Sequence, residues 1–260
     1  MSGQLRVERD GAIGLLIFDQ QQRRNAITAE MWAAIPAAAA ELSADPQVRV
    51  VVMRGAGDVA FVAGADISEF AQLRSGDSAR AYDESNTEAF AALAAIDKPV
   101  IAMIHGFCVG GGVALSLTAD LRYSADDGRF AVPAARLGLG YFMSGVETLG
   151  RLVGYSNAKE IFFTGRRFDA QEALHMGLLN AVYPKAELEA AVMDTARAIA
   201  DNAPLTIRAV KRSVQELSRP ESERDRGRVE QTIAECYASD DYKEGVTAFL
   251  EKRSPRFQGR

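Results

Sequence analysis

The chain has 260 residues, of which 48% are hydrophobic and 25% are charged, a composition typical of a globular protein with a sizeable core. The formal net charge of −5 argues against a nucleic-acid-binding protein. Cys108 and Cys236 lie far apart and do not indicate a disulfide framework, so a reducing compartment is expected. Residues 1–10 lack the apolar core of a signal peptide. We therefore expect a cytoplasmic protein whose partners include neither a membrane nor a nucleic acid.

Short apolar runs alternate with helical segments in the first half of the chain. The two earliest runs predict a hairpin that turns at Asp10-Gly11, and Thr28 is placed to cap the first helix. Strands are predicted over residues 5–9, 13–18, 48–54, 99–104 and 121–124, and helices over residues 31–42, 66–73, 80–96 and 111–118. Strands that alternate with helices through short connections indicate the α/β class, in which ligands bind where strands end.

The pattern becomes mostly helical after Ser144. Helices are predicted over residues 146–153, 157–164, 170–176 and 186–202, and Pro204 opens a further run of helices that extends to the C-terminus. This last segment is too short to form a core of its own easily. We therefore divide the chain into a core over residues 1–203 and a helical region over residues 204–260, which packs on the core or on another subunit.

Two loops rich in small residues point to a specific chemistry. The first reads FVAGADI over residues 61–67, and the second reads HGFCVGGG over residues 105–112. Gly111 opens a predicted helix, so its N–H is an unpaired donor at the positive end of the helix dipole, and Ala65 precedes a second predicted helix start. Two backbone N–H groups that converge on one carbonyl oxygen form an oxyanion hole, which suits a thioester oxygen that becomes an enolate.

Other chemistries lack their motifs in this chain. The glycine run fits neither the dinucleotide-binding spacing nor a P-loop, and there is no G-x-S-x-G nucleophile elbow. No cluster of Cys and His residues has metal-ligand spacing, so no metal is expected. His105 and His175 are interpreted as structural residues, and Cys108 as a small buried filler.

Several further segments are distinctive when they are taken together. They are RNAI (24–27), FVAGADI (61–67), KPVIA (98–102) with His105-Gly106, GGG (110–112), ADLR (119–122), AKE (158–160), ALHMGLLN (173–180), APL (203–205) and EGVTAFLEKR (244–253). Jointly they resemble the crotonase superfamily, the enoyl-CoA hydratase/isomerase family. The resemblance implies an α/β spiral of repeated ββα units with a C-terminal helical trimerisation region. It also implies homotrimers or dimers of trimers that act on acyl-CoA thioesters, with no prosthetic group and coenzyme A as part of the substrate.

The same resemblance implies roles for individual residues. Ala65 and Gly111 would supply the two N–H groups of the oxyanion hole. The coenzyme A path would be lined by Ala63, Asp66, Ile67 and Ser68, with Arg24 nearby. Phe249 and Lys252 would approach the adenine end of the ligand, from this chain or from a neighbouring subunit.

Two positions depart from the hydratases of this family. Those enzymes carry one glutamate shortly after the glycine triplet and a second glutamate after a downstream proline. Here the corresponding positions read Val113-Ala114 and Pro133-Ala134, and an alanine cannot transfer a proton. Hydration needs a base that activates water and an acid that protonates the α-carbon. The chain therefore lacks the usual equipment for hydration.

A narrower resemblance favours decarboxylation instead. The segments RLGLGY (136–141) and DDYKEG (240–245) are similar to the methylmalonyl-CoA decarboxylase branch, in which a tyrosine at the position of Tyr141 faces the substrate carboxylate. Ala65 stands where that branch has a histidine. Loss of CO₂ from a malonyl-type thioester forms the enolate without a base. Two alternatives stay open: a hydratase or isomerase with a non-standard acid or base such as Glu147, and a catalytically inactive acyl-CoA-binding protein. Tyr141 itself is either a ligand-facing residue or a core aromatic.

Overall fold

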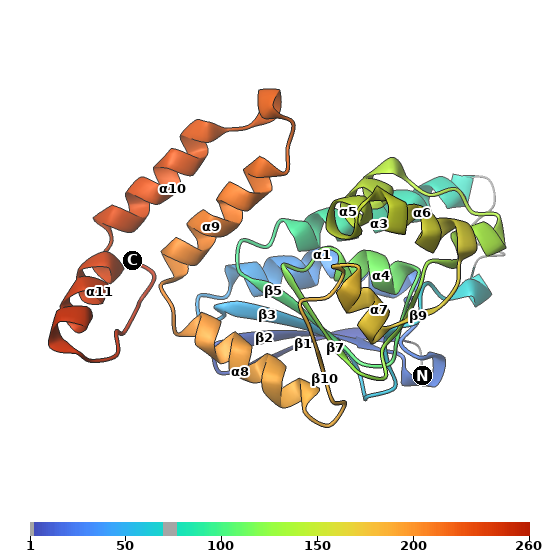
Figure 1. The fold of residues 1–260 in the computed structure, drawn as a ribbon, viewed down its shortest axis with the longest axis horizontal. Helices are drawn as coiled ribbons and strands as arrows, with labels where there is room; N and C mark the ends of the chain where they lie inside the picture. The colour runs from blue at the N-terminus through green and yellow to red at the C-terminus, as the bar shows by residue number, and fades with distance from the viewer. Residues whose placement is uncertain (1–2, 70–76) are drawn as a thin grey trace.

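Two β-sheets form the body of the protein, with helices packed around them (Figure 1). The computed structural model describes residues 3–69 and 77–260. The larger sheet has the strand order β1 (Gln4–Asp10), β2 (Ile13–Asp19), β3 (Val50–Gly55), β5 (Val100–Ile104), β7 (Leu121–Ala125) and β10 (Ala181–Tyr183). The smaller sheet has the order β4 (Ala60–Val62), β6 (Phe107–Val109), β8 (Arg129–Ala131) and β9 (Phe168–Asp169).

Consecutive strands are divided between the two sheets. β3, β5 and β7 pair in parallel in the larger sheet, and the strand that follows each of them, β4, β6 or β8, pairs in parallel in the smaller sheet. A helix follows each pair, which gives a repeated ββα unit. Parallel strands joined through helices define the α/β class, so the expected class is confirmed.

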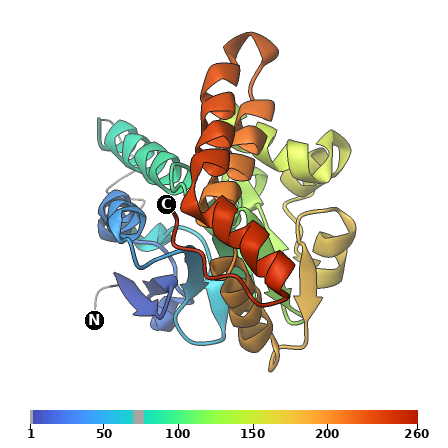
Figure 2. The same ribbon diagram turned by 90° about the vertical axis from the view of Figure 1, so that its left-hand side faces the viewer.

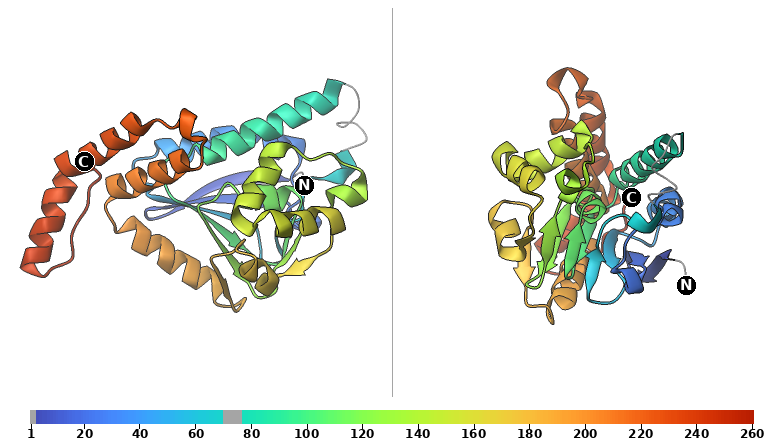
Figure 3. Two further views of the ribbon diagram at one scale, coloured as in Figure 1. Left: turned by 45° about the horizontal axis from the view of Figure 1, so that its top comes forward. Right: turned by 90° about the vertical axis from the view of Figure 1, so that its right-hand side faces the viewer.

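Four helices of the body, α1, α4, α6 and α7, start at a side-chain cap or directly after a glycine. Thr28 caps α1, since its hydroxyl accepts a hydrogen bond from the Met31 N–H at 3.2 Å, as expected. α3 lies along α1 (Figure 3). The helices of the body are α1 (Ala29–Ala44), α3 (Asp77–Ala94), α4 (Gly111–Ser116), α5 (Met143–Val153), α6 (Tyr155–Thr164), α7 (Ala170–His175) and α8 (Leu188–Ala200).

The strands β2, β3 and β5 of the larger sheet are buried on both faces, which explains why their sequences are continuous apolar runs. Along β3, Val51 and Met53 belong to the core that contains α1 and α3. Val50 and Val52 point to the opposite face and pack in a second core against α8. Side chains alternate between the faces of a strand, so a run of four apolar residues fills both cores.

Three C-terminal helices form an arm that extends away from the sheets (Figures 1 and 2). They are α9 (Pro204–Leu217), α10 (Arg226–Ala238) and α11 (Asp240–Glu251). The chain then returns towards the body, where the guanidinium group of Arg49 donates to the Phe257 carbonyl at 2.6 Å and to the Ala200 carbonyl at 2.9 Å. Arg49 therefore links the core to the C-terminal tail.

Two features differ from the sequence-based expectations. Residues 66–73 were expected to start a helix, but Ile67–Glu69 is a single 3-10 turn, and residues 70–73 lie outside the described residues. The smaller sheet was not expected, because its strands are two or three residues long and too short to show a periodic pattern. Within residues 3–69 and 77–260, none of the helices combines the length and the hydropathy that a membrane span requires.

Candidate active site

Three chain segments converge at one edge of the smaller sheet. Because β4, β6 and β8 are adjacent and parallel, their carboxyl ends lie at the same edge. The chain continues from these ends into Ala65, Gly111 and Ala134 respectively. This edge therefore brings together both predicted oxyanion residues and Ala134, one of the two alanines predicted to stand where hydratases have a glutamate.

The oxyanion loops lie in direct contact. A methyl carbon added to Gly111 would lie 3.6 Å from the Ala65 nitrogen and 3.3 Å from Cζ2 of Trp32. Neither the Ala65 N–H nor the Gly111 N–H donates a hydrogen bond to any residue that the structure describes. Unpaired backbone donors that are close together and fixed in place are what an oxyanion hole requires.

Flanking hydrogen bonds hold the first loop in place. The Ile27 N–H donates to the Gly64 carbonyl at 2.8 Å, and the Asp66 N–H donates to the Ile27 carbonyl at 2.8 Å. These two bonds form a parallel bridge between Ile27 and Ala65 and leave the Ala65 N–H unused.

The glycine triplet has two separate backbone requirements. Gly110 has a φ of +52° and lies just before the first residue of α4, where its N–H donates to the Ala131 carbonyl at 2.8 Å. A Cβ on Gly112 would lie 2.1 Å from the Val62 carbonyl oxygen, so only glycine allows α4 to approach the end of β4. Gly111 opens the helix, as predicted.

The Asp66 carboxylate is committed to contacts within the protein. It is 8% exposed and accepts hydrogen bonds from Arg23 at 2.7 and 2.8 Å and from Gln20 at 3.0 Å. Ser68 donates to it through its N–H at 3.1 Å and its hydroxyl at 2.7 Å. Burial alone would raise the pKa of Asp66, but these hydrogen bonds outweigh it, so the pKa lies below its usual value. A ligand in this region would meet the backbone at Asp66 rather than its carboxylate.

The remaining residues of the predicted coenzyme A path lie beside this network. The Arg24 carbonyl accepts from the Ala63 N–H at 3.0 Å, and the Arg24 guanidinium lies 4.5 Å from the centre of the Phe107 ring. Ile67 is 62% exposed although it is apolar. The structure therefore gathers Arg24, Ala63 and residues 66–68 into one surface next to Ala65.

Phe249 and Lys252 do not join this surface within one chain. Phe249 is on α11, and Lys252 is the first residue after this helix. The helix lies at the opposite end of the molecule from α5 and α6 (Figure 1). Phe249 is 83% exposed, and Lys252 has left-handed backbone with a φ of 54°. Within one chain these two residues therefore lie far from the surface beside Ala65, and their approach to a ligand from a neighbouring copy stays a prediction.

A pocket of about 320 Å³ lies between α5, α6 and the turn after β8. Its lining consists mainly of apolar and aromatic side chains: Ala134, Ala135, Leu139, Tyr141, Val146, Tyr155, Ala158, Lys159, Phe162 and Phe163. Tyr141 and Ala134 thus face the same pocket, although the sequence places them on different sides of a glycine turn. The volume suits a small acyl group.

Tyr141 is held against two neighbours but has a free hydroxyl. Its ring lies 4.7 Å from the Phe162 ring, and a Cβ on Gly145 would lie 2.7 Å from its Cε1 atom. The hydroxyl forms no hydrogen bond with a residue in the described part of the chain, and its burial raises the pKa of Tyr141, although the whole residue is 37% exposed. A core tyrosine would have its hydroxyl paired, so the ligand-facing interpretation gains support.

The remaining candidates for acid, base or nucleophile are placed unfavourably. Glu147 pairs with Arg151 at 2.6 Å, is 45% exposed and does not line the pocket. Burial raises the pKa of the Cys108 thiol, which disfavours the thiolate. Burial also lowers the pKa of His105, and the positive charge of Arg54 lowers it further. The described residues contain no group of three or more potential metal ligands.

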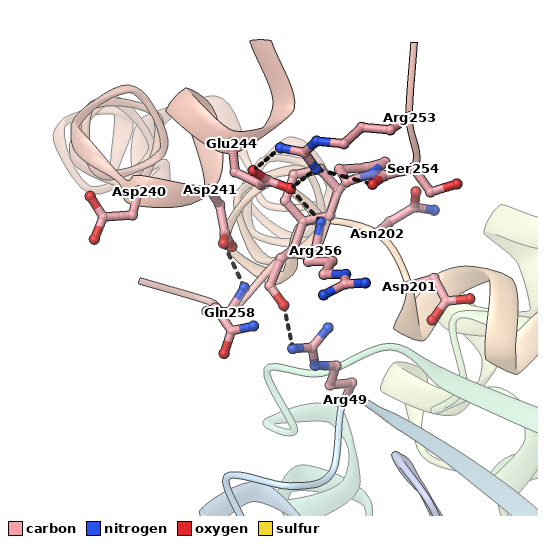
Figure 4. A pocket seen from close by; sticks show the side chains of 12 residues that line it. Arg49, Asp201, Asn202, Asp240, Asp241, Glu244, Arg253, Ser254, Arg256 and Gln258 are labelled. Carbon is pink, nitrogen blue, oxygen red and sulfur yellow. Dashed lines mark hydrogen bonds and ion pairs between the residues drawn. The ribbon is translucent and has the colours of Figure 1, made fainter. Parts of the chain in front are cut away.

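A larger cavity, of about 1130 Å³, has no residue of the loops at Ala65 and Gly111 in its lining. Figure 4 shows the residues that line it. Arg49, Asp201 and Asn202 line this cavity on the side of the body, and residues of α11 and the C-terminal tail line its other side. Arg253 pairs with Glu244 at 2.6 Å and, with the Arg256 N–H, holds the pKa of Glu244 at about 2. The groups on the tail side are thus largely paired with one another.

Sequence reasoning missed several residues that build the site. Asn25 is 1% exposed and donates to the carbonyls of Ala56 at 3.0 Å and Ala60 at 2.8 Å, which fixes the approach to β4. Trp32 contacts Gly111 from α1. Lys159 was noted only as part of a family segment, although residues 155, 158, 159, 162 and 163 have the spacing of one helix face.

Comparisons with known proteins agree with this architecture. Residues 8–260 match the enoyl-CoA hydratase/isomerase family. The chain is 31% identical over 247 residues to a short-chain-enoyl-CoA hydratase of Clostridium acetobutylicum, covering 95% of this chain and 94% of that protein. It is 34% identical over 267 residues to a carnitinyl-CoA dehydratase of Escherichia coli O157:H7, with full coverage of both.

A solved structure gives the same answer. A putative enoyl-CoA hydratase/isomerase family protein of Hyphomonas neptunium superposes with a TM-score of 0.93 at 36% identity, covering 98% of each chain. This similarity confirms the expected crotonase-type fold. The chain therefore belongs to the enoyl-CoA hydratase/isomerase family, the crotonase superfamily.

Proposed function

We propose that the protein binds acyl-CoA thioesters and stabilises a thioester enolate with the N–H groups of Ala65 and Gly111. The observation that carries this proposal is the pair of unpaired donors on two loops in contact, where a methyl on Gly111 would lie 3.6 Å from the Ala65 nitrogen. The names of the relatives, a short-chain-enoyl-CoA hydratase and a carnitinyl-CoA dehydratase, refer to CoA esters and support the substrate class. Coenzyme A would follow the surface formed by Arg24, Ala63 and residues 66–68.

The favoured reaction is decarboxylation of a malonyl-type thioester. Ala114 and Ala134 take the positions of the two hydratase glutamates and cannot transfer a proton. In decarboxylation, the bond between the α-carbon and the carboxylate breaks, CO₂ leaves, and the electron pair passes to the thioester as an enolate. The α-carbon then takes up one proton. No base needs to remove a carbon-bound proton, so the oxyanion hole is the main requirement.

Tyr141 would orient the carboxylate that leaves. A phenol that stays protonated can donate a hydrogen bond without placing a cation in an apolar pocket. The raised pKa of Tyr141 and its unpaired hydroxyl support this role. A neutral donor also suits the reaction, because a cation paired with the departing carboxylate would stabilise the starting state.

The region over residues 204–260 would assemble the protein into a homotrimer or a dimer of trimers. Its helices expose large apolar side chains that water disfavours: Val210, Val214, Leu217, Ile233, Tyr237, Val246, Phe249 and Leu250. A neighbouring copy would cover part of this surface. Phe249 and Lys252 would then reach the adenine end of coenzyme A bound by another subunit.

Hydration is the second candidate, and the names of the relatives favour it, since several are called hydratases. It would require an unrecognised acid or base. A third candidate is an inactive acyl-CoA-binding protein.

Assays of the purified protein with malonyl-, methylmalonyl- and crotonyl-CoA separate the three candidates. We expect loss of CO₂ from a malonyl-type thioester and very slow hydration of crotonyl-CoA. Rapid hydration of crotonyl-CoA without decarboxylation would establish the second candidate, and binding without turnover would establish the third.

The variant Tyr141→Phe tests the carboxylate role. A hydrogen bond to a charged group is worth about 1.5–3 kcal/mol, so turnover of the malonyl-type substrate should fall about 10- to 150-fold. Binding of a plain acyl-CoA should stay nearly unchanged. Tyr183→Phe is the matched control, since it removes a hydroxyl from β10, outside this pocket. If Tyr141→Phe weakened the malonyl-type thioester and the plain acyl-CoA equally, Tyr141 would have only a packing role.

A further inference from the structure

One face of α6 forms a wall of the apolar pocket. Tyr155, Ala158, Lys159 and Phe162 line the pocket, and their spacing of three and four residues places them on the same side of the helix. Lys159 is the one charged side chain among the described residues that line the pocket. Its exposed position on α6 lets the ammonium group reach the solvent edge of the pocket while its carbon chain covers apolar surface.

The polar side chains of this pocket can all donate a hydrogen bond, although the two tyrosine hydroxyls can also accept one. The side chains contribute the hydroxyls of Tyr141 and Tyr155 and the ammonium group of Lys159, with no carboxylate among them. Lys159 forms no ion pair or hydrogen bond with a residue in the described ranges, and the adjacent Glu160 is paired with Arg166 at 2.8 Å. A ligand group that complements this pocket is therefore an anion with several acceptor atoms.

We propose that Lys159 is a specificity-determining residue that selects acyl groups bearing a carboxylate. This inference rests on the proposed function, because it assigns the pocket to the acyl group of a CoA thioester. The ammonium group of Lys159 attracts the acyl carboxylate at the solvent edge, and the Tyr141 hydroxyl receives it inside. Lys159 acts on binding and not on bond cleavage, since an ion pair with the departing carboxylate would oppose the loss of CO₂.

Binding measurements with ligands that do not react test the proposal. The probes are succinyl-CoA, whose acyl group ends in a free carboxylate, and butyryl-CoA, whose acyl group has a similar length and no charge. An exposed ion pair is worth about 0.2–1 kcal/mol, so Lys159→Gln should weaken succinyl-CoA binding about 1.4- to 5-fold in isothermal titration calorimetry. Butyryl-CoA binding should not change. The preference of the wild type for succinyl-CoA should shrink as salt is added.

Two further variants provide controls. Lys159→Arg keeps the positive charge and should retain the preference for succinyl-CoA. Lys185→Gln removes the same charge from a lysine that pairs with Asp58 at 3.2 Å and Asp127 at 3.0 Å outside the pocket, and it should not change the preference.

The outcome is independent of the reaction that the protein performs. If decarboxylation is absent but Lys159→Gln weakens succinyl-CoA alone, the proposed reaction fails and the role of Lys159 stands. If a malonyl-type thioester is decarboxylated, Lys159→Gln should raise KM by the same factor of about 1.4 to 5, the size of an exposed ion pair, and leave kcat unchanged. An equal change for succinyl-CoA and butyryl-CoA, or no change for either, would overturn the proposal.

Discussion

Replacing Gly111 by alanine should abolish most of the activity without unfolding the protein. Gly111 is the first residue of α4 and does not have left-handed backbone, so alanine fits the local conformation. The added methyl would lie 3.3 Å from Cζ2 of Trp32, a tight contact that a shift of a few tenths of an ångström relieves. Alanine also favours helix over glycine by about 1 kcal/mol in a helix interior. We therefore expect the free energy of unfolding to change by less than about 1 kcal/mol.

The effect on catalysis follows from the position of the same methyl. It would lie 3.6 Å from the Ala65 nitrogen and would occupy space beside that donor. An oxyanion must approach each donor nitrogen to within about 2.7–3.1 Å, so the methyl and the oxyanion compete for this space. Loss of one oxyanion donor typically costs a factor of about 10²–10³ in kcat, or roughly 2.7–4 kcal/mol. We expect a loss of this size on the substrate that proves active.

Gly140→Ala is the matched control, because a Cβ at Gly140 meets no atom within 4 Å. It should keep both stability and activity. Trp32 is the single tryptophan of the chain, so its fluorescence reports directly on the packing beside Gly111. Thermal unfolding and this emission spectrum show whether Gly111→Ala is folded. A folded Gly111→Ala variant with full kcat would refute the oxyanion assignment.

Three further outcomes are expected. Ala114→Glu combined with Ala134→Glu should raise crotonyl-CoA hydration, measured by loss of the enoyl absorbance; an unchanged rate would mean that these positions do not face the reacting carbons. Asp66→Asn should lower the free energy of unfolding at neutral pH by about 1–2 kcal/mol, since the carboxylate holds Arg23. The folded pKa of Asp66 lies below its ordinary value of 3.8, so this stabilisation is present above pH 3.8 and is lost as the pH falls through the folded pKa. In acid denaturation, the stability difference between the variant and the wild type should therefore vanish at low pH. A difference that persists at low pH would contradict this role of Asp66. Val214→Asp, at a side chain 60% exposed on α9, should reduce the mass measured by light scattering, and an unchanged mass would exclude this face from the subunit interface.

Local patterns in the sequence determined most of the elements. The apolar runs that became β2, β3, β5 and β7 are long enough to identify as strands, because both faces of the larger sheet are buried. The hydroxyl of Thr28 caps α1 through a contact three residues away. Gly111 opens α4 because the glycine run ends the preceding strand. Each of these features can be identified from residues that are near one another in the chain.

The candidate pocket was harder to predict from the sequence. Tyr141 was recognised through a family motif, but its contact with Phe162 depends on how α6 packs against the turn after β8. Lys159 has no sequence signature beyond its helical spacing, and its relevance appears only once the pocket has formed.

Only the tertiary structure decided how the distant segments meet. The strands β4, β6 and β8 have three residues each, too few for a periodic signal, yet their parallel pairing brings Ala65, Gly111 and Ala134 to one edge. The sequence alone identifies the two candidate donors and the alanine at position 134. Their convergence depends on hydrogen bonds between strands that are far apart in the chain. Local sequence does not encode this convergence, because the interacting groups become neighbours only after the chain has folded.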